Sequence, residues 1–309
     1  MNYTEKGSKV YLFSIVLVAV IGGLLFGYDT AVISGAEKGL QAFFMGADFQ
    51  YTDTMHGITS SSALIGCIIG SALSGIFASR LGRKRSLFIA GFFFFLSALG
   101  SYYPEFLFFD YGEPSFSLLI AFNFYRVVGG IGVGLASAIC PMYIAEIAPS
   151  NIRGTLVSWN QFAIIFGQLV VYFVNFIILG NHVNPVIDLV NGANQIMNPE
   201  AAAWTTETGW RLMFGSEAFP AGIFTILVLL VPETPRYLAM CGKDEKALSV
   251  LSRINGLAKA QVILSEIKAS TEEKKERLFT YGWMVIFIGI MLSVFQQAVG
   301  INAVLYFAP

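Results

Sequence analysis

The chain has 309 residues, of which 55% are hydrophobic and 13% are charged. Soluble domains carry charge on about a quarter of their residues, so this composition excludes an ordinary soluble domain. The formal net charge of −1 provides no basic surface for nucleic acid. The 28 Phe and 31 Gly are typical of membrane helices, because Phe faces lipid and Gly lets helices approach closely.

Seven apolar runs are long enough to span a membrane. A bilayer core of about 30 Å needs roughly 20 apolar residues in a helix. Backbone groups in lipid must be hydrogen-bonded within their own segment, so each run is expected to be a helix. The expected spans are residues 11–34, 57–79, 86–104, 117–140, 155–179, 214–232 and 281–305.

The basic residues predict how these helices are oriented. With a cytoplasmic N-terminus, 16 of the 19 Lys and Arg fall in inner segments. Basic loops are retained in the cytoplasm, so the N-terminus is predicted to be cytoplasmic. These inner segments are residues 1–10, 80–86, 146–154 and 233–280.

Three regions are expected in an all-α membrane protein. Residues 1–232 hold six spans, 233–280 form a charged cytoplasmic linker, and 281–309 hold a seventh span of an incomplete second bundle. The linker is expected to form short amphipathic helices, with a solvated, transiently helical linker as the alternative. Its apolar residues at helical spacing are Ala247, Leu248, Leu251 and Ile254. Because the chain ends directly after an apolar run, we expect a longer intact protein.

Three charges fall inside predicted spans, where charge is costly and therefore a functional candidate. They are Asp29, Arg126 and Glu217. Counted at about 1.5 Å per residue, all three lie in the outer half of the bilayer at depths that let them meet. Burial favours the neutral form of a carboxyl group, and a nearby cation favours its ionised form. A group under both influences can exchange a proton when the cation moves away. The alternative is a static ion pair that holds helices together.

Amide side chains mark two spans. Gln161, Gln168 and Asn175 are seven residues apart and share one helix face. Amides both donate and accept, which suits a ligand rich in hydroxyl groups, although they also join helices in lipid. In the seventh span, Gly300 interrupts a helix with further polar side chains, as in the broken helices of transporter sites. These side chains are Gln296, Gln297, Asn302 and Tyr306.

The inner loops carry a basic cluster and nearby acids. The segment Arg80-Leu81-Gly82-Arg83-Lys84-Arg85 is sufficient to set topology, and it can also form a cytoplasmic gate with Glu146 and Arg153. The glycines at 129, 130, 132 and 134 indicate close helix packing. His56 and His182, with three unrelated Cys, form no metal-binding pattern, and no nucleophile–base pattern is present. We therefore expect neither a metal site nor an enzyme.

Together these motifs resemble the sugar porter family of the major facilitator superfamily. The matching stretches are Gly22 to Asp29, Arg80 to Arg85, Tyr125 to Gly134, Pro141 to Glu146, Asn160 to Gln168, Pro232 to Arg236 and Gln296 to Asn302. The resemblance covers nearly the whole chain. It implies a six-helix N-terminal bundle, a cytoplasmic helical linker and the seventh transmembrane helix of that fold.

The resemblance also implies roles for individual residues. Asp29 is expected to carry the proton, tuned by Arg126 and Glu217, since uniporters of the family tend to have Asn at this position. The implied sugar contacts are Phe26, Gln161, Gln168, Gln296, Gln297, Asn302 and Tyr306. The implied cytoplasmic gate comprises Arg80, Arg83, Lys84, Glu146, Arg153, Glu233 and Arg236, with Ser79 replacing the family's usual acidic residue.

The function implied by the resemblance is proton-coupled uptake of a pentose, D-xylose in particular, by alternating access in a bacterial inner membrane. The proton is the coupling ion, no other cofactor is expected, and the protein is expected to be a monomer in the lipid bilayer. The alternatives are a uniporter or symporter of another hexose, pentose or polyol, and a non-transporting sugar sensor.

Overall fold

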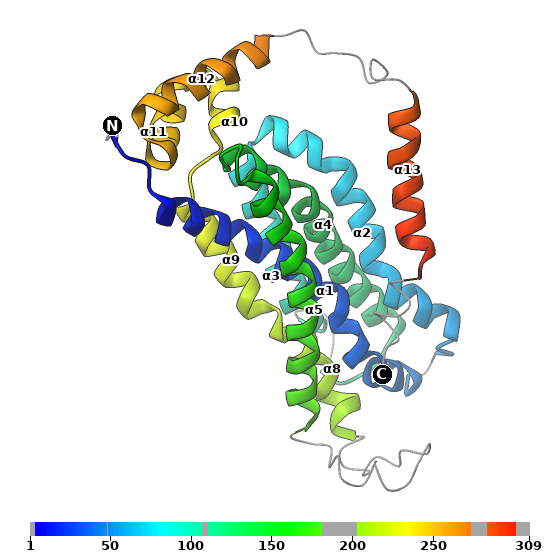
Figure 1. Cartoon of the computed structure of the whole chain (residues 1–309). Helices are drawn as coiled ribbons and strands as arrows, with labels where there is room; N and C mark the ends of the chain where they lie inside the picture. The colour runs from blue at the N-terminus through cyan, green and yellow to red at the C-terminus, as the bar shows by residue number, and fades with distance from the viewer. Residues whose placement is uncertain (1–3, 48, 107–110, 181–202, 273–282, 301–309) are drawn as a thin grey trace, which may run out of the picture. The chain divides into compact units, whose positions relative to one another are not determined.

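The computed structural model describes residues 4–47, 49–106, 111–180, 203–272 and 283–300. The chain divides into two compact units, Lys9–Thr234 and a second unit that combines Met1–Ser8 with Pro235–Pro309. Within the described residues, all regular secondary structure is helical (Figure 1). The expectation of an all-α membrane protein is therefore confirmed.

The described residues of the larger unit form six helices that are long and apolar enough to cross a membrane. The first three are α1 (Lys9–Met45), α2 (Asp53–Arg80) and α3 (Arg83–Tyr102). They are followed by α4 (Phe116–Ile147) and α5 (Arg153–Gly180). The sixth, Thr205–Leu230, combines a π-helical turn η1 (Thr205–Gly209) with α8 (Trp210–Ser216) and α9 (Ala218–Leu230). The first six of the seven predicted spans are therefore confirmed as apolar helices of spanning length, and the sixth begins nine residues before its expected start.

Helix α4 lies at the centre of this unit, packed against α2, α3 and α1, while α5 packs against α1 and α9 against α3. Glycines make these approaches possible. A Cβ atom on Gly130 would lie 2.0 Å from the Ala63 carbonyl oxygen, and one on Gly27 would lie 1.9 Å from that of Ile164. Any larger residue would push the helices apart, which confirms the packing role predicted for the glycines of α4.

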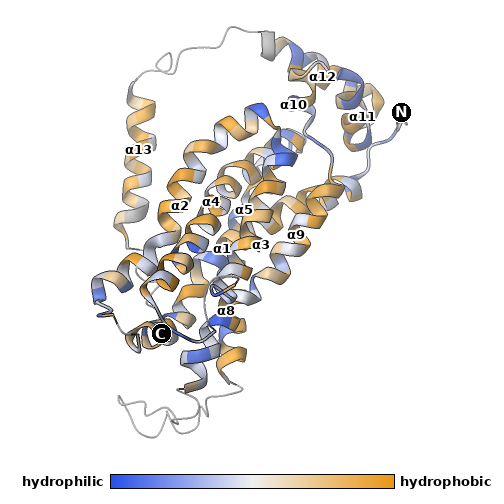
Figure 2. Cartoon of the chain, turned by 180° about the vertical axis from the view of Figure 1, so that it is seen from behind, coloured by the Kyte–Doolittle hydropathy of each residue, from blue (hydrophilic) through white to orange (hydrophobic). Residues whose placement is uncertain are grey.

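The outward surface of the six helices is apolar. Figure 2 shows predominantly hydrophobic residues along these helices. Large apolar residues remain exposed on this surface: Ile68 on α2 is 72% exposed and Phe219 on α9 is 75% exposed. A surface of this kind is stable against lipid and not against water, so the unit is that of a multi-pass membrane protein.

The second unit contains α10 (Pro235–Met240), α11 (Asp244–Asn255), α12 (Leu257–Glu272) and α13 (Trp283–Ala298). On α11, Ala247, Leu251 and Ile254 are buried and Leu248 is half-buried, which confirms the predicted amphipathic helix. An ion pair between Asp244 and Lys268 joins α11 to α12. The apolar α13 covers the centre of the predicted seventh span.

Candidate functional site

A buried ion pair joins α1 to α4. The Nη1 atom of Arg126 donates to Oδ1 of Asp29 over 2.6 Å, and the two residues are 2% and 1% exposed. The guanidinium also lies 5.0 Å from the centroid of the Phe214 ring. Charges removed from water in this way need close partners, because an isolated buried charge is strongly destabilising. The structure thus brings together two of the three intramembrane charges singled out in the sequence.

The third charge, Glu217, lies beside this pair at the junction of α8 and α9. It is 1% exposed and interacts electrostatically with both Asp29 and Arg126. Its Oε1 atom has no hydrogen-bond partner among the described residues. Two carboxyl groups therefore share one guanidinium inside the bundle. Uptake of a single proton makes such a cluster electrically neutral, which offsets the cost of burying an excess charge.

The three amides predicted on one face of α5 have different environments. Gln161 is exposed and Gln168 is half-buried. Asn175 is buried, and its Nδ2 atom donates to the Val32 carbonyl oxygen of α1 over 3.3 Å. Asn175 therefore joins two helices, whereas Gln161 and Gln168 present amides that a ligand can reach.

Of the other predicted ligand residues, Phe26 is half-buried on α1. The side chains of Gln296 and Gln297, and all of Asn302 and Tyr306, lie outside the described residues. A cavity of about 780 Å³ opens between α1 and α5, but its lining is mostly apolar and includes none of the predicted amides. It is lined by Leu17, Val20, Thr155, Ser158, Trp159 and Phe162.

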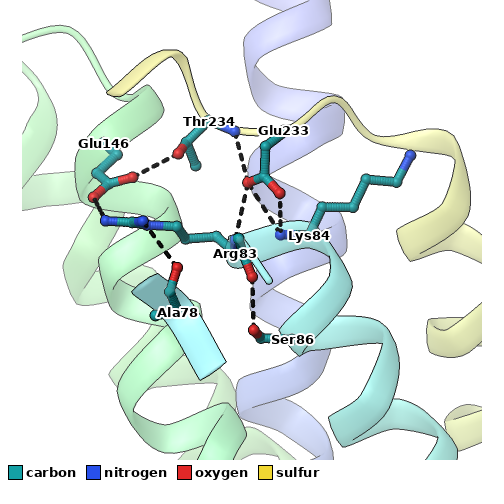
Figure 3. Close-up of polar contacts among 8 residues, drawn as sticks. Ala78, Arg83, Lys84, Ser86, Glu146, Glu233 and Thr234 are labelled. Carbon is teal, nitrogen blue, oxygen red and sulfur yellow. Dashed lines mark hydrogen bonds and ion pairs between the residues drawn. The ribbon is translucent and has the colours of Figure 1, made fainter. Parts of the chain in front are cut away.

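At one end of the bundle, a polar network connects α3, α4 and the segment after α9 (Figure 3). The Nη2 atom of Arg83 donates to Oε1 of Glu146 over 2.7 Å, and both side chains are 9% exposed. The Thr234 hydroxyl donates to the second Glu146 oxygen over 2.6 Å. We call the group Arg83, Glu146, Glu233 and Thr234 the inner latch.

Glu233 acts in the inner latch by accepting backbone hydrogens at the start of α3. Its carboxylate accepts from the Arg83 and Lys84 amides over 3.0 and 3.2 Å. A carboxylate at a helix N-terminus is stabilised by the unpaired amides and the helix dipole. The Lys84 ammonium donates instead to the Leu229 carbonyl oxygen near the end of α9, over 2.7 Å.

For three further arginines, the role predicted in the cytoplasmic gate stays a prediction. Arg80 is exposed at the end of α2, and Arg236 belongs to α10 of the second unit. Arg153 is exposed at the start of α5, and no ion pair among the described residues joins it to Glu146. Ser79 is exposed and donates to the Ile76 carbonyl oxygen.

Comparison with known proteins places this architecture in a family. A family model described as "Sugar (and other) transporter" matches residues 15–309. The chain belongs to the sugar transporter family. It is 47% identical to the D-xylose-proton symporter of Escherichia coli K12, across 97% of the chain and 60% of that relative. It is 34% identical to the arabinose-proton symporter of Bacillus subtilis and 33% identical to the glucose facilitated diffusion protein of Zymomonas mobilis.

Solved structures from this sugar transporter family have the same fold. The partially occluded, inward-open xylose transporter XylE of E. coli matches with a TM-score of 0.82 and 46% identity, over 97% of this chain and 66% of that one. XylE bound to 6-bromo-6-deoxy-D-glucose matches with a TM-score of 0.83 and 47% identity, over 97% and 62%. The chain spans about 60% of the length of the curated relatives it matches.

This sugar transporter family member also has a second buried ion pair, which sequence reasoning missed. Glu105 follows α3, and Arg211 lies in the first turn of α8. Both guanidinium Nη atoms donate to the Glu105 carboxylate, with Nη1 to Oε2 at 2.7 Å. The Arg211 guanidinium also lies 4.4 to 5.0 Å from three ring centroids, those of Phe43, Tyr111 and Trp210. The sequence signal that could have indicated this ion pair was the adjacent Trp210 and Arg211 at the start of an apolar run.

His56, which directly precedes the expected second span, is buried in the first turn of α2. Its ring contacts the Tyr51 hydroxyl over 3.1 Å and Glu37 over 3.3 Å. Burial raises the pKa of the Tyr51 phenol above its usual 10.0. Among the described residues, no group of three or more His, Cys, Asp or Glu side chains is placed to hold a metal ion.

Proposed function

We propose that the protein containing this chain transports a sugar across the membrane together with a proton, and that the sugar is a pentose such as D-xylose. One observation carries the proposal: the buried cluster of Asp29, Arg126 and Glu217, with two carboxyl groups and one guanidinium. Relatives named as xylose–proton and arabinose–proton symporters support the substrate class. The proton serves as the coupling ion, and no other cofactor is needed.

The cluster provides a physical route to coupling. While Arg126 holds the Asp29 carboxylate, the charge of Asp29 is compensated and the proton is absent. When the guanidinium moves away, burial favours the neutral acid, so Asp29 takes up a proton. A group that alternates between these two partners can make proton movement a condition for the helix rearrangement that carries the sugar.

The sugar is proposed to bind amides that the larger unit leaves reachable. Gln161 and Gln168 on α5 present donors and acceptors for hydroxyl groups. Phe26 is proposed to contact a sugar face, and Gln296, Gln297, Asn302 and Tyr306 to complete the polar set. The inner latch would hold one end of the bundle closed while this site faces the other side.

The basic residues support a cytoplasmic N-terminus in a bacterial inner membrane. The inner latch joins the α2–α3 connection, the end of α4 and the segment after α9, so these regions lie at one end of the bundle. Their cluster of basic side chains supports the proposal that this end faces the cytoplasm. We propose a monomer as the transporting unit, since all three charges of the proposed coupling cluster come from one chain.

Asp29→Asn tests the proposal in the full-length protein, reconstituted in vesicles. The neutral amide cannot carry a proton, so accumulation of labelled xylose against its gradient should be lost while sugar counterflow persists. Glu37→Gln, on the same helix, is the matched control and should leave accumulation unchanged. Full concentrative uptake by Asp29→Asn would overturn the proposal.

Facilitated diffusion is the second candidate, because a relative that is 33% identical is named a glucose facilitated diffusion protein. The two candidates differ in proton movement. Adding xylose to unbuffered vesicles should alkalinise the outer medium if transport is coupled, and a constant outer pH during uptake would establish the uniporter. Binding without any flux would instead indicate a sensor.

A further inference from the structure

A buried serine of α3 lies close to the charged cluster. Ser97 is 1% exposed, and its Oγ atom has no hydrogen-bond partner among the described residues. Serine hydroxyls in helices usually bond to a carbonyl of the preceding turn, as Ser86 does with Gly82. A fully buried hydroxyl without any partner is uncommon and needs an explanation.

Gly129 of α4 separates this hydroxyl from Asp29. A Cβ atom on Gly129 would lie 2.3 Å from Oγ of Ser97 and 3.8 Å from Oδ1 of Asp29. The two oxygens are therefore within about 6 Å of each other, across a space that is open only because residue 129 is glycine. One bridging water with hydrogen bonds of about 2.8 Å on each side spans this separation, and a direct bond requires the carboxyl group to move by up to about 3 Å.

The other polar groups around Asp29 have different chemistry. Arg126 on α4 only donates, and it favours the ionised carboxylate. Glu217 is a second acid that shares a side-chain hydrogen bond with Asp29, and Cys67 on α2 presents a weakly polar thiol within electrostatic range. The Tyr28 hydroxyl is already bonded to Ser216 over 2.7 Å. Ser97 thus offers a neutral acceptor for the hydrogen of a protonated Asp29.

We infer that Ser97 is a positioning residue for the proton step: it accepts the hydrogen of the neutral Asp29 carboxyl, directly or through one water, after Arg126 has moved away. The inference rests on the proposed function. No covalent bond changes, since the proton stays on Asp29 and Ser97 holds its orientation. Asp29 therefore has a partner in each protonation state, Arg126 when ionised and Ser97 when neutral.

The test is the pH dependence of xylose-driven proton uptake by the full-length protein in vesicles. Ser97→Ala removes the acceptor for the neutral acid, so protonation should require more acid conditions. The midpoint should move to lower pH by about half a unit to one unit, the equivalent of one hydrogen bond. Ser101→Ala is the matched control, because Ser101 is one turn along the same helix, equally buried and also unpartnered. Its profile should overlay that of the unmodified protein.

Two further variants separate the possible failures. Ser97→Thr keeps the hydroxyl and should retain the original midpoint, and equal shifts for Ala and Thr would show that packing is responsible and overturn the inference. An unshifted Ser97→Ala profile would also overturn it. If Asp29→Asn still accumulates sugar in the same vesicles, the proposed function fails. If that variant loses accumulation while Ser97→Ala is unshifted, the inference alone fails.

Discussion

The Asp29–Arg126 and Glu105–Arg211 ion pairs of the larger unit differ in the number of acids that lie beside one base. Arg211 donates two hydrogen bonds to Glu105, with both side chains no more than 1% exposed, and it is surrounded by three aromatic rings. One acid meets one base. Arg126 donates to one oxygen of Asp29, and a second acid, Glu217, lies beside them with an oxygen that has no hydrogen-bond partner in the part of the chain that the structure describes.

This difference separates a structural pair from a functional one. Protonation destabilises a bidentate pair of equal and opposite charges, because a neutral Glu105 would leave Arg211 as an uncompensated buried cation. In the cluster around Asp29, a proton removes an excess charge. Burial alone therefore does not identify a functional charge, and the local balance of acids and bases is the informative property.

Breaking the saturated pair should have the largest effect on stability. Glu105→Gln leaves the Arg211 guanidinium buried without its counter-charge, which should lower the free energy of unfolding by about 3–5 kcal/mol. Thermal unfolding in detergent, followed by fluorescence, measures the change. Adding Arg211→Met should restore part of the loss, since the lone charge is then absent. A stable Glu105→Gln protein would contradict the structural assignment.

Breaking the inner latch should lower the free energy of unfolding by an intermediate amount, because its ion pair is close to water. Glu146→Gln keeps the shape of the side chain but weakens charge-assisted bonds from Arg83 and Thr234. The expected loss is about 1.5–3 kcal/mol in the same unfolding assay. Arg153→Gln is the matched control, since no ion pair among the described residues joins Arg153 to Glu146, and it should change stability by less than about 0.5 kcal/mol. Equal effects of the two variants would contradict the inner latch.

The sequence predicted one pair and missed the other for a physical reason. Charges are rare in the interior of an apolar run, so Asp29 and Arg126 had few possible partners, and counting residues placed them at similar depths. Glu105 and Arg211 lie at the edges of such runs, where charge is ordinary. Their contact depends on how the end of α3 meets the start of α8, which hydropathy does not record.

The amides of α5 also show that residue spacing predicts a helix face but not the contacts that each side chain makes. Spacing predicts Gln161, Gln168 and Asn175 on one face, because the helical period fixes direction. It does not say which part of that face a neighbouring helix covers. Helix α1 approaches closely at Gly35, so Asn175 is buried there and bonds the Val32 carbonyl oxygen. The end of α1 at Met45 likewise follows from packing, since Phe43 and Phe44 are buried well beyond the predicted span.

Among the Glu105–Arg211 pair, the inner latch and the Asp29 cluster, the smallest effect of a single substitution on stability is expected at Asp29, although its effect on transport is the largest. Asp29→Asn removes one of two acids around Arg126, and Glu217 then remains as the single counter-charge. The cluster becomes neutral without a proton, so the free energy of unfolding should change by less than about 1 kcal/mol, far below the loss expected for a broken one-to-one pair. The same fluorescence assay measures it beside Glu105→Gln.

Asp29→Asn combined with Glu217→Gln supplies the control for this comparison. The double variant leaves Arg126 buried without any acid, so it should lose stability on the scale of Glu105→Gln, about 3–5 kcal/mol. If Asp29→Asn alone already costs that much, Glu217 cannot replace Asp29 beside the guanidinium. The pair would then be a one-to-one structural contact like that of Glu105 and Arg211, and the excess charge on which proton uptake depends would not exist.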